Sequence, residues 1–207
     1  MSAPAPGDEL ETLRQRIAAC TLCAAHLPLG PRPIARFSAT SRILIIGQAP
    51  GTKVHLSGVA WDDDSGDRLR AWLGLDKQTF YDEAQVALMP MGFCYPGKAP
   101  NKNGGGGDAP PRPECAPQWH DAVLGVLPPG RLTLVVGTYA QDAYLPETKG
   151  WTMTERVRAF GQFRTRIALP HPAWRARLWI GKNPWFEADV LPALRTRIAE
   201  ALAQVIR

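Results

Sequence analysis

The sequence has no long run of apolar residues and no recognisable export signal. No apolar stretch approaches the roughly 20 residues that a membrane-spanning helix needs. The first residues, MSAPAPG, lack the basic and apolar segments of a signal peptide. Composition excludes intrinsic disorder, because 45% of the residues are hydrophobic and only 21% are charged. We therefore expect a cytoplasmic globular protein without a membrane partner.

Net charge is missing from the first half of the chain. Residues 1–111 hold 11 basic and 11 acidic side chains, whereas residues 112–207 hold 13 and 8, so the second half carries the whole formal charge of +5. Most of the basic residues there are arginines, whose planar guanidinium groups suit phosphate. A charge of this size also fits a basic protein whose charge only keeps it soluble. The uneven distribution of the charge along the chain favours a polyanionic partner.

Glycine and proline are abundant, with 19 and 20 residues, and they separate short apolar runs from helical patterns. Four runs are typical of strands buried on both faces of a parallel sheet: residues 43–46, 86–89, 132–137 and 166–169. Helical patterns occupy residues 9–20, 67–75, 118–127, 139–145, 152–160 and 184–202. This alternation predicts an α/β fold, a three-layer αβα sandwich with a four-stranded, mainly parallel central sheet. We expect a flexible tail over residues 1–8 and a single domain over residues 9–207.

The expected strands end in loops that are rich in glycine, proline and polar residues. In parallel α/β sheets, ligands bind outside the carboxyl ends of the strands. The loops expected there are residues 47–51, 90–92, 137–139 and 169–172. The second of them continues as a long loop to about residue 117, and structureless loops of such length are usually functional in compact domains. The sequence therefore predicts the binding site at this edge of the sheet.

The four cysteines all lie in expected loops or at the ends of expected elements. They are Cys20, Cys23, Cys94 and Cys115, and the first two form a CxxC pair. Disulfides are rare in cytosolic proteins, which leaves a structural zinc site, a [4Fe–4S] cluster or free thiols. The CxxC pair and the loop positions favour a metal site over free thiols. The spacing does not distinguish zinc from an iron–sulfur cluster.

Several motifs together resemble those of a known family. Residues 47–51 (GQAPG) follow the first expected strand, residues 132–145 (LTLVVGTYAQDAYL) combine a strand, a glycine and a helix, and residues 170–173 read PHPA. With the four cysteines in matching order, the chain resembles the uracil-DNA glycosylase superfamily from about residue 10 to 200. It is most similar to the iron–sulfur branch, family four, whose motifs read GEAPG and HPS. The resemblance implies that the four cysteines hold a [4Fe–4S] cluster, with structural zinc as the alternative.

The resemblance implies excision of a damaged base from DNA, the first step of base excision repair. The target base leaves the duplex and enters a pocket. His171 matches the family's histidine, which stabilises the departing base as an anion. Such donors contribute ~3 kcal/mol in comparable sites. The resemblance also implies that Gln48 and Ala49 bind the base or position water.

Further residues are implied in base binding and DNA binding. Gly47 and Gly51 would let the backbone approach the base and sugar closely. Trp61 stands where the family has a phenylalanine that stacks on the base, although a buried core tryptophan is an equal alternative. In the loop after the histidine, the implied minor-groove wedge and its phosphate-binding neighbours are Trp174, Arg175 and Arg177.

The sequence departs from the family pattern at three places. Gln48 and Ala49 leave the first motif without a carboxylate to orient the attacking water. Pro90 stands where the family has an asparagine that reads uracil, and proline offers neither a side-chain donor nor an N–H group. The residues that could substitute are Asp62, Asp63 and Asp64 for the carboxylate and Asn101, Asn103 or His55 for the reader. The glycines at residues 104–107 indicate an insertion in the long loop.

These observations support three hypotheses. The first is a DNA N-glycosylase, a hydrolase acting on uracil or on another deaminated base such as hypoxanthine, with DNA as its partner and a monomer by default. The second is a weak or inactive glycosylase-fold protein that binds DNA or lesions without cutting. The third is an unrelated α/β nucleotide-binding enzyme with a zinc site. The motifs favour the first hypothesis.

Overall fold

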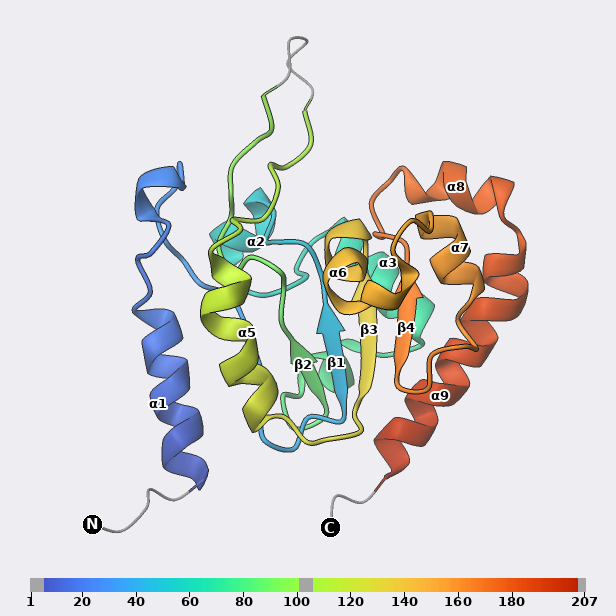
Figure 1. Cartoon of the computed structure of the whole chain (residues 1–207), viewed down its shortest axis with the longest axis horizontal. Coiled ribbons are helices and arrows are strands. Elements are labelled where there is room, and N and C mark those ends of the chain that lie inside the picture. The colour runs from blue at the N-terminus through green and yellow to red at the C-terminus, as the bar shows by residue number, and fades with distance from the viewer. Residues whose placement is uncertain (1–5, 101–105, 205–207) are drawn as a thin grey trace.

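The computed structural model describes residues 6–100 and 106–204, and it has a parallel β-sheet at its centre (Figure 1). The strands are β1 (Ile43–Ile46), β2 (Val86–Leu88), β3 (Leu132–Val136) and β4 (Arg166–Leu169). Their order is β2-β1-β3-β4, and every pairing is parallel. The predicted α/β sandwich is therefore confirmed, and the sheet is wholly parallel.

Helices surround the sheet on both faces. Their bounds are α1 Pro6–Ala18, α2 Thr52–Ser57, α3 Asp64–Leu73, α4 Lys77–Tyr81, α5 Cys115–Val126, α6 Thr138–Tyr144, α7 Met153–Arg158, α8 Ala176–Lys182 and α9 Leu191–Ala203. Short 3₁₀ turns occur at Ala24–His26 and Pro146–Thr148, and a π-helical turn at Phe186–Val190 precedes α9. No helix within the described ranges is long and apolar enough to cross a membrane.

Strand β1 shows why continuous apolar runs form this sheet. All four of its residues are buried, and its pleat points successive side chains to opposite faces. Ile43 and Ile45 join a core that includes side chains from α3 and α9. Leu44 and Ile46 join a second core that includes side chains from α1 and α5. One strand thus contributes to both cores, which requires an apolar residue at every position.

Several helix boundaries differ from the predictions. Helix α1 begins at Pro6, so residues 6–8, expected in the flexible tail, are helical. Proline is favoured at the first helical position, because its fixed φ suits the helix and its missing N–H is not needed there. Residues 1–5 of that expected tail lie outside the described residues. Helix α3 begins at Asp64 because the Asp63 carboxylate accepts a hydrogen bond from the Gly66 N–H (2.8 Å). Helices α2, α4 and α8 were not predicted.

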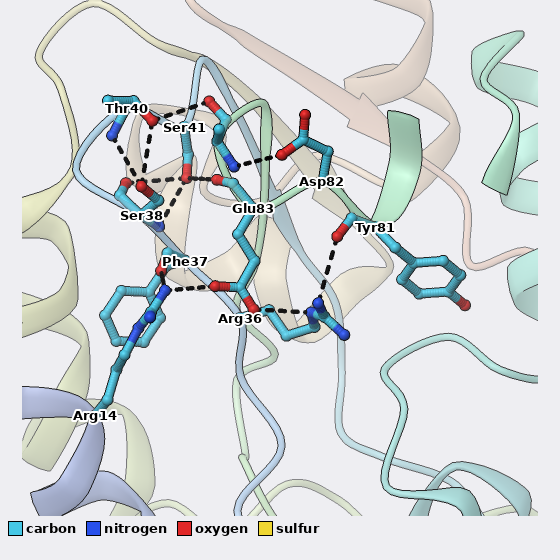
Figure 2. A network of polar contacts seen from close by, with 10 residues as sticks. Arg14, Arg36, Phe37, Ser38, Thr40, Ser41, Tyr81, Asp82 and Glu83 are labelled. Carbon is cyan, nitrogen blue, oxygen red and sulfur yellow. Dashed lines mark hydrogen bonds and ion pairs between the residues drawn. The ribbon is translucent and has the colours of Figure 1, made fainter. Parts of the chain in front are cut away.

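A polar network secures the sheet edge that holds the amino ends of the strands (Figure 2). Glu83, just before β2, pairs with Arg14 of α1 and with Arg36 (3.1 Å to its Nε). The Ser41 hydroxyl, just before β1, donates to the Glu83 carbonyl (2.7 Å). The network therefore ties α1 to the segments that enter the two strands, at the edge opposite the predicted site.

Candidate functional site

A cavity of about 590 Å³ lies at the carboxyl edge of the sheet, within the usual size range for ligand pockets. Segments that follow three of the strands line it, together with the long loop after β2. The lining includes Gln48, Ala49, Pro50, Gly51, Trp61, Asp63, Pro90, Lys98, Asp108, Tyr139, His171, Trp174 and Arg175. The structure thus gathers most of the predicted site residues around one cavity, at the expected edge.

Contacts at the ends of β3 and β4 hold the backbone next to His171. The Leu169 carbonyl, at the end of β4, accepts hydrogen bonds from the Gly137 N–H and from the Gln141 side-chain amide, each 2.9 Å long. Gly137 has a φ of +82°, and a Cβ atom there would lie 3.4 Å from that of His171. On the far side, Arg68 donates to the Pro172 carbonyl (2.6 Å). These contacts fix the backbone on both sides of His171.

The charge state of His171 is governed by its surroundings. Burial lowers the pKa of His171, whereas the nearby carboxylates of Asp63 and Asp108 raise it. Burial is the larger effect, so the imidazole is neutral at pH 7 and carries one N–H donor. No described residue forms a hydrogen bond with the ring. A neutral ring that lines a cavity can donate to a carbonyl oxygen of a ligand.

Trp61 lies beside His171 in a strained backbone conformation. The two ring centroids are 5.8 Å apart with planes tilted by 32°. Trp61 has a φ of +58°, the one positive φ among the described non-glycine residues, and such strain is concentrated at functional sites. A Cβ atom on Gly47 would lie 2.7 Å from Cζ2 of Trp61. Gly47 was predicted to allow close approach of the base, and the structure shows close approach of this indole.

The other first-motif residues differ in their roles. Ala49 and Gly51 line the cavity. Gln48 also lines it, and its amide donates to the Ala109 carbonyl in the long loop (3.5 Å). The motif therefore places no carboxylate of its own in the cavity.

Pro90 lines the cavity but is held through its carbonyl. That oxygen accepts a hydrogen bond from Nε2 of His120 (3.1 Å), and Nδ1 of His120 lies 2.6 Å from the Tyr144 hydroxyl. Burial lowers the pKa of His120. The neutral tautomer consistent with both bonds carries its proton on Nε2 and accepts from Tyr144 at Nδ1.

Of the residues proposed to replace the missing carboxylate and the missing base reader, only some line the cavity. Asp63 lines the cavity. Asp62 and Asp64 are exposed outside it, and Asp64 pairs with Lys53 (2.8 Å). His55 is buried beside Tyr95 and does not reach the cavity. The other proposed base readers, Asn101 and Asn103, lie outside the described residues.

Asp108 lines the cavity but was not predicted from the sequence. A Cβ atom on Gly51 would lie 3.2 Å from Oδ2 of Asp108 and 4.0 Å from Oδ2 of Asp63, so two carboxylates flank this glycine. No local motif surrounds Asp108, and it follows a glycine-rich insertion. The available signal was the length of the loop, which indicated a function without naming a residue.

The expected DNA-binding residues lie in and after the loop that follows His171. Trp174 is 65% exposed, and the Arg175 guanidinium lies 5.3 Å from the centre of its ring. Both residues line the mouth of the cavity. Arg177 is exposed on α8 and does not line the cavity. A large exposed aromatic ring beside an arginine suits contact with a nucleic acid.

All four cysteines line a second, small cavity, under the end of α1 and the start of α5. The Phe93 N–H donates to Sγ of Cys115 (3.2 Å). Burial raises the pKa of Cys23, of Cys94 and, to about 12, of Cys115, and neighbouring thiols add to each shift. Bound metal would have to displace these protons.

Both predicted groups, a structural zinc ion and a [4Fe–4S] cluster, need cysteine donors that converge on one place. Within residues 6–100 and 106–204, no three histidine, cysteine or acidic side chains are arranged to hold a single metal ion. Four thiols around one hollow are the donor set of a [4Fe–4S] cluster and also of a structural zinc site, so their chemistry fits either group.

One comparison with known proteins bears on this site. Residues 34–195 match the family model described as "Uracil DNA glycosylase superfamily". The match includes the GQAPG segment, Trp61, Asp108 and His171, and thus the segments that form the larger cavity. It begins after Cys20 and Cys23. The chain therefore belongs to the uracil-DNA glycosylase superfamily.

Proposed function

We propose that the protein is a DNA repair glycosylase that hydrolyses the N-glycosidic bond of a flipped-out deaminated base, with uracil the first candidate. The observation that carries this proposal is the position of His171. A neutral imidazole lines a cavity of about 590 Å³ beside an indole ring, at the edge where α/β proteins bind ligands. Membership of the superfamily supports a glycosylase-type activity.

His171 acts on the departing base. As the bond between C1′ and the base breaks, its electron pair leaves with the base, and negative charge develops on a carbonyl oxygen. The N–H of His171 donates to that oxygen and stabilises the anion. A rigidly held donor needs no reorganisation during the reaction, and removal of one such donor costs roughly 10²–10³-fold in rate. The Trp61 ring beside it provides an apolar surface for the base.

Trp174 and Arg175 receive the DNA around the extruded base. Trp174 fills the gap that the base leaves in the stack, and Arg175 contacts a phosphate. Exposure of Trp174 at the mouth of the cavity supports this assignment. Arg177 contributes positive charge from α8. Apolar wedges with neighbouring arginines are the usual means by which proteins hold a kinked duplex.

Cys20, Cys23, Cys94 and Cys115 are proposed as the ligands of a [4Fe–4S] cluster. Their common cavity supports a shared role for the four cysteines, and the resemblance to the iron–sulfur branch favours a cluster over zinc. When bound, the cluster would supply a covalent connection among three segments of the chain. The chemistry at the base is assigned to the larger cavity, which none of the cysteines lines.

A second candidate function is recognition without cutting. Pro90 supplies no side-chain donor for a base, and the first motif carries no carboxylate. The same features fit a glycosylase for another deaminated base, such as hypoxanthine, which presents different donors and acceptors from uracil.

Base release distinguishes these functions. Oligonucleotides would carry uracil opposite guanine, uracil opposite adenine, or hypoxanthine opposite thymine, and wild type would run beside His171→Ala. Release that disappears in the variant supports the glycosylase and identifies its base. Absence of release from a folded protein that binds the same DNA would favour the non-cutting function.

A further inference from the structure

The loop between Cys94 and Cys115 contains a two-stranded arm, here residues 97–100 and 106–109. The Ala99 N–H donates to the Gly107 carbonyl (2.9 Å), and the Ala109 N–H donates to the Gly97 carbonyl (2.8 Å). Lys98 and Asp108 pair directly across the arm. Figure 1 shows this segment, in green, projecting beyond the carboxyl edge of the sheet. Residues of the arm, among them Lys98 and Asp108, line the cavity that His171 also lines.

Asp108 directs one carboxylate oxygen toward the first motif. Its Oδ1 accepts from the Lys98 ammonium (2.7 Å), which fixes the side chain. Its Oδ2 would lie 3.2 Å from a Cβ atom on Gly51. Asp108 and His171 line the same cavity, and the charge of Asp108 acts on the imidazole. The carboxylate is thus within the electrostatic reach of the group that stabilises the departing base.

Gln48 connects the arm to the first motif. Its amide N–H donates to the carbonyl of Ala109, the residue after Asp108 (3.5 Å). A glutamate at this position could not donate that bond, because an ionised carboxylate only accepts. Gln48 thus replaces the carboxylate of the family's first motif. Through the same side chain it also holds the arm that brings the Asp108 carboxylate close to that motif.

We propose that Asp108 is the catalytic carboxylate that orients and deprotonates the attacking water, an inference that rests on the proposed glycosylase function. The bond between C1′ and the base breaks, and its electron pair leaves with the base. The water oxygen forms a new bond to C1′, and one water proton passes to Asp108, which later releases it to solvent. The positive charge that develops on the sugar is stabilised by the same carboxylate.

Asp63 is the competing carboxylate in this cavity. Its Oδ1 is engaged by the Gly66 N–H at the start of α3 (2.8 Å), and its Oδ2 lies farther from the Gly51 position than that of Asp108. Its charge also serves the helix N-terminus, where a negative group is stabilised. Asp63 is therefore assigned a supporting electrostatic role, and the experiment compares the two residues directly.

The test compares single-turnover base release by Asp108→Asn and Asp63→Asn on the substrate that wild type cleaves best. We expect Asp108→Asn to lose ~10²-fold or more in rate, the usual contribution of a general base. Asp63→Asn should lose less, since asparagine caps a helix as well as aspartate.

Two further variants separate chemistry from structure. Lys98→Met breaks the same ion pair but keeps the carboxylate, so its rate of base release should fall less than that of Asp108→Asn. Asp64→Asn removes an exposed neighbouring charge and should behave as wild type. Equal losses in Lys98→Met and Asp108→Asn, or a larger loss in Asp63→Asn, would overturn the assignment.

The wild-type result separates this inference from the function on which it rests. Wild type that releases no base from any of the three duplexes overturns both. Release that is lost in His171→Ala but kept in Asp108→Asn overturns the role of Asp108 alone. Thermal midpoints of all variants, measured beside the rates, identify any loss that comes from unfolding.

Discussion

Gly47 shows how a single missing atom shapes the cavity. Because it has no side chain, the Trp61 indole can lie against the backbone of the first motif. That position brings the indole beside His171. The glycine therefore acts on the site through Trp61, whereas its predicted role from the sequence was to admit the base and sugar.

Substitution of Gly47 should displace Trp61. The added Cβ of Gly47→Ala would meet the indole at 2.7 Å, so the ring must move. We expect a loss of ~1–3 kcal/mol in the free energy of unfolding and a weaker interaction with the base. Urea unfolding and base release measure the two effects. Gly125→Ala on α5 is the matched control, because a Cβ atom there has no neighbouring heavy atom within 4 Å. An equal loss of stability in Gly125→Ala would contradict a displacement of Trp61 as the cause.

His120 should make stability depend on pH. Burial lowers the pKa of His120 below its ordinary value of 6.5, so the unfolded chain binds a proton more readily than the folded one. The stabilising contribution is present above pH 6.5 and is lost as the pH falls further. Urea unfolding at pH 7.5 and 5.5 should show a smaller decrease for His120→Gln than for wild type. His171, whose pKa is also lowered, should account for part of the remaining decrease.

At the scale of elements, the strands and the ends of the sheet were predictable because each strand is a short and mostly apolar segment followed by glycine, proline or polar residues. Helices α2, α4 and α8, of five to seven residues, were not predicted, whereas the similarly short α6 and α7 were. At such lengths, apolar periodicity is an unreliable guide to helices. The candidate site was predicted where motifs follow strands, as with His171. Asp108 could not be predicted because its position depends on pairing across the arm and on the Gln48 contact, neither of which has a sequence pattern.

The network around Glu83 should affect stability and leave the chemistry unchanged (Figure 2). Glu83→Gln removes the ion pairs with Arg14 and Arg36, which are partly exposed. We therefore expect a loss of ~1 kcal/mol, measurable by urea unfolding. The exposed pair of Lys53 with Asp64 is the comparison, and Lys53→Gln should have no measurable effect. A change in base release per folded molecule in Glu83→Gln would contradict a purely structural role.

At the scale of the whole molecule, the four cysteines come from distant parts of the chain and line one small cavity. Cys20 and Cys23 follow α1, Cys94 follows β2, and Cys115 begins α5. The arm that carries Asp108 lies between Cys94 and Cys115. A cluster held by all four would therefore fix both ends of the loop that reaches the cavity. The sequence predicted a metal site at the four cysteines from the CxxC pair and the loop positions, but not that the loop between Cys94 and Cys115 lines the larger cavity.

Loss of one cysteine should weaken the fold more than the chemistry. For Cys20→Ala we expect a loss of ~2–3 kcal/mol, comparable to that of a cross-link, which corresponds to roughly 5–10 °C in thermal midpoint. Visible absorbance would report the cluster, and thermal unfolding would report stability. Full stability together with lost base release in Cys20→Ala would contradict a structural role.

The strand order has a consequence for how the molecule opens. Strands β1 and β3 are hydrogen-bonded on both sides, whereas β2 and β4 are edge strands. The first motif therefore extends from a central strand and His171 from an edge strand. Amide protons in β4 should exchange with solvent sooner than those in β1, because edge pairing is released by smaller fluctuations. Local opening of the native state would therefore displace His171, the proposed donor to the leaving base, before it disturbs the first motif at residues 47–51.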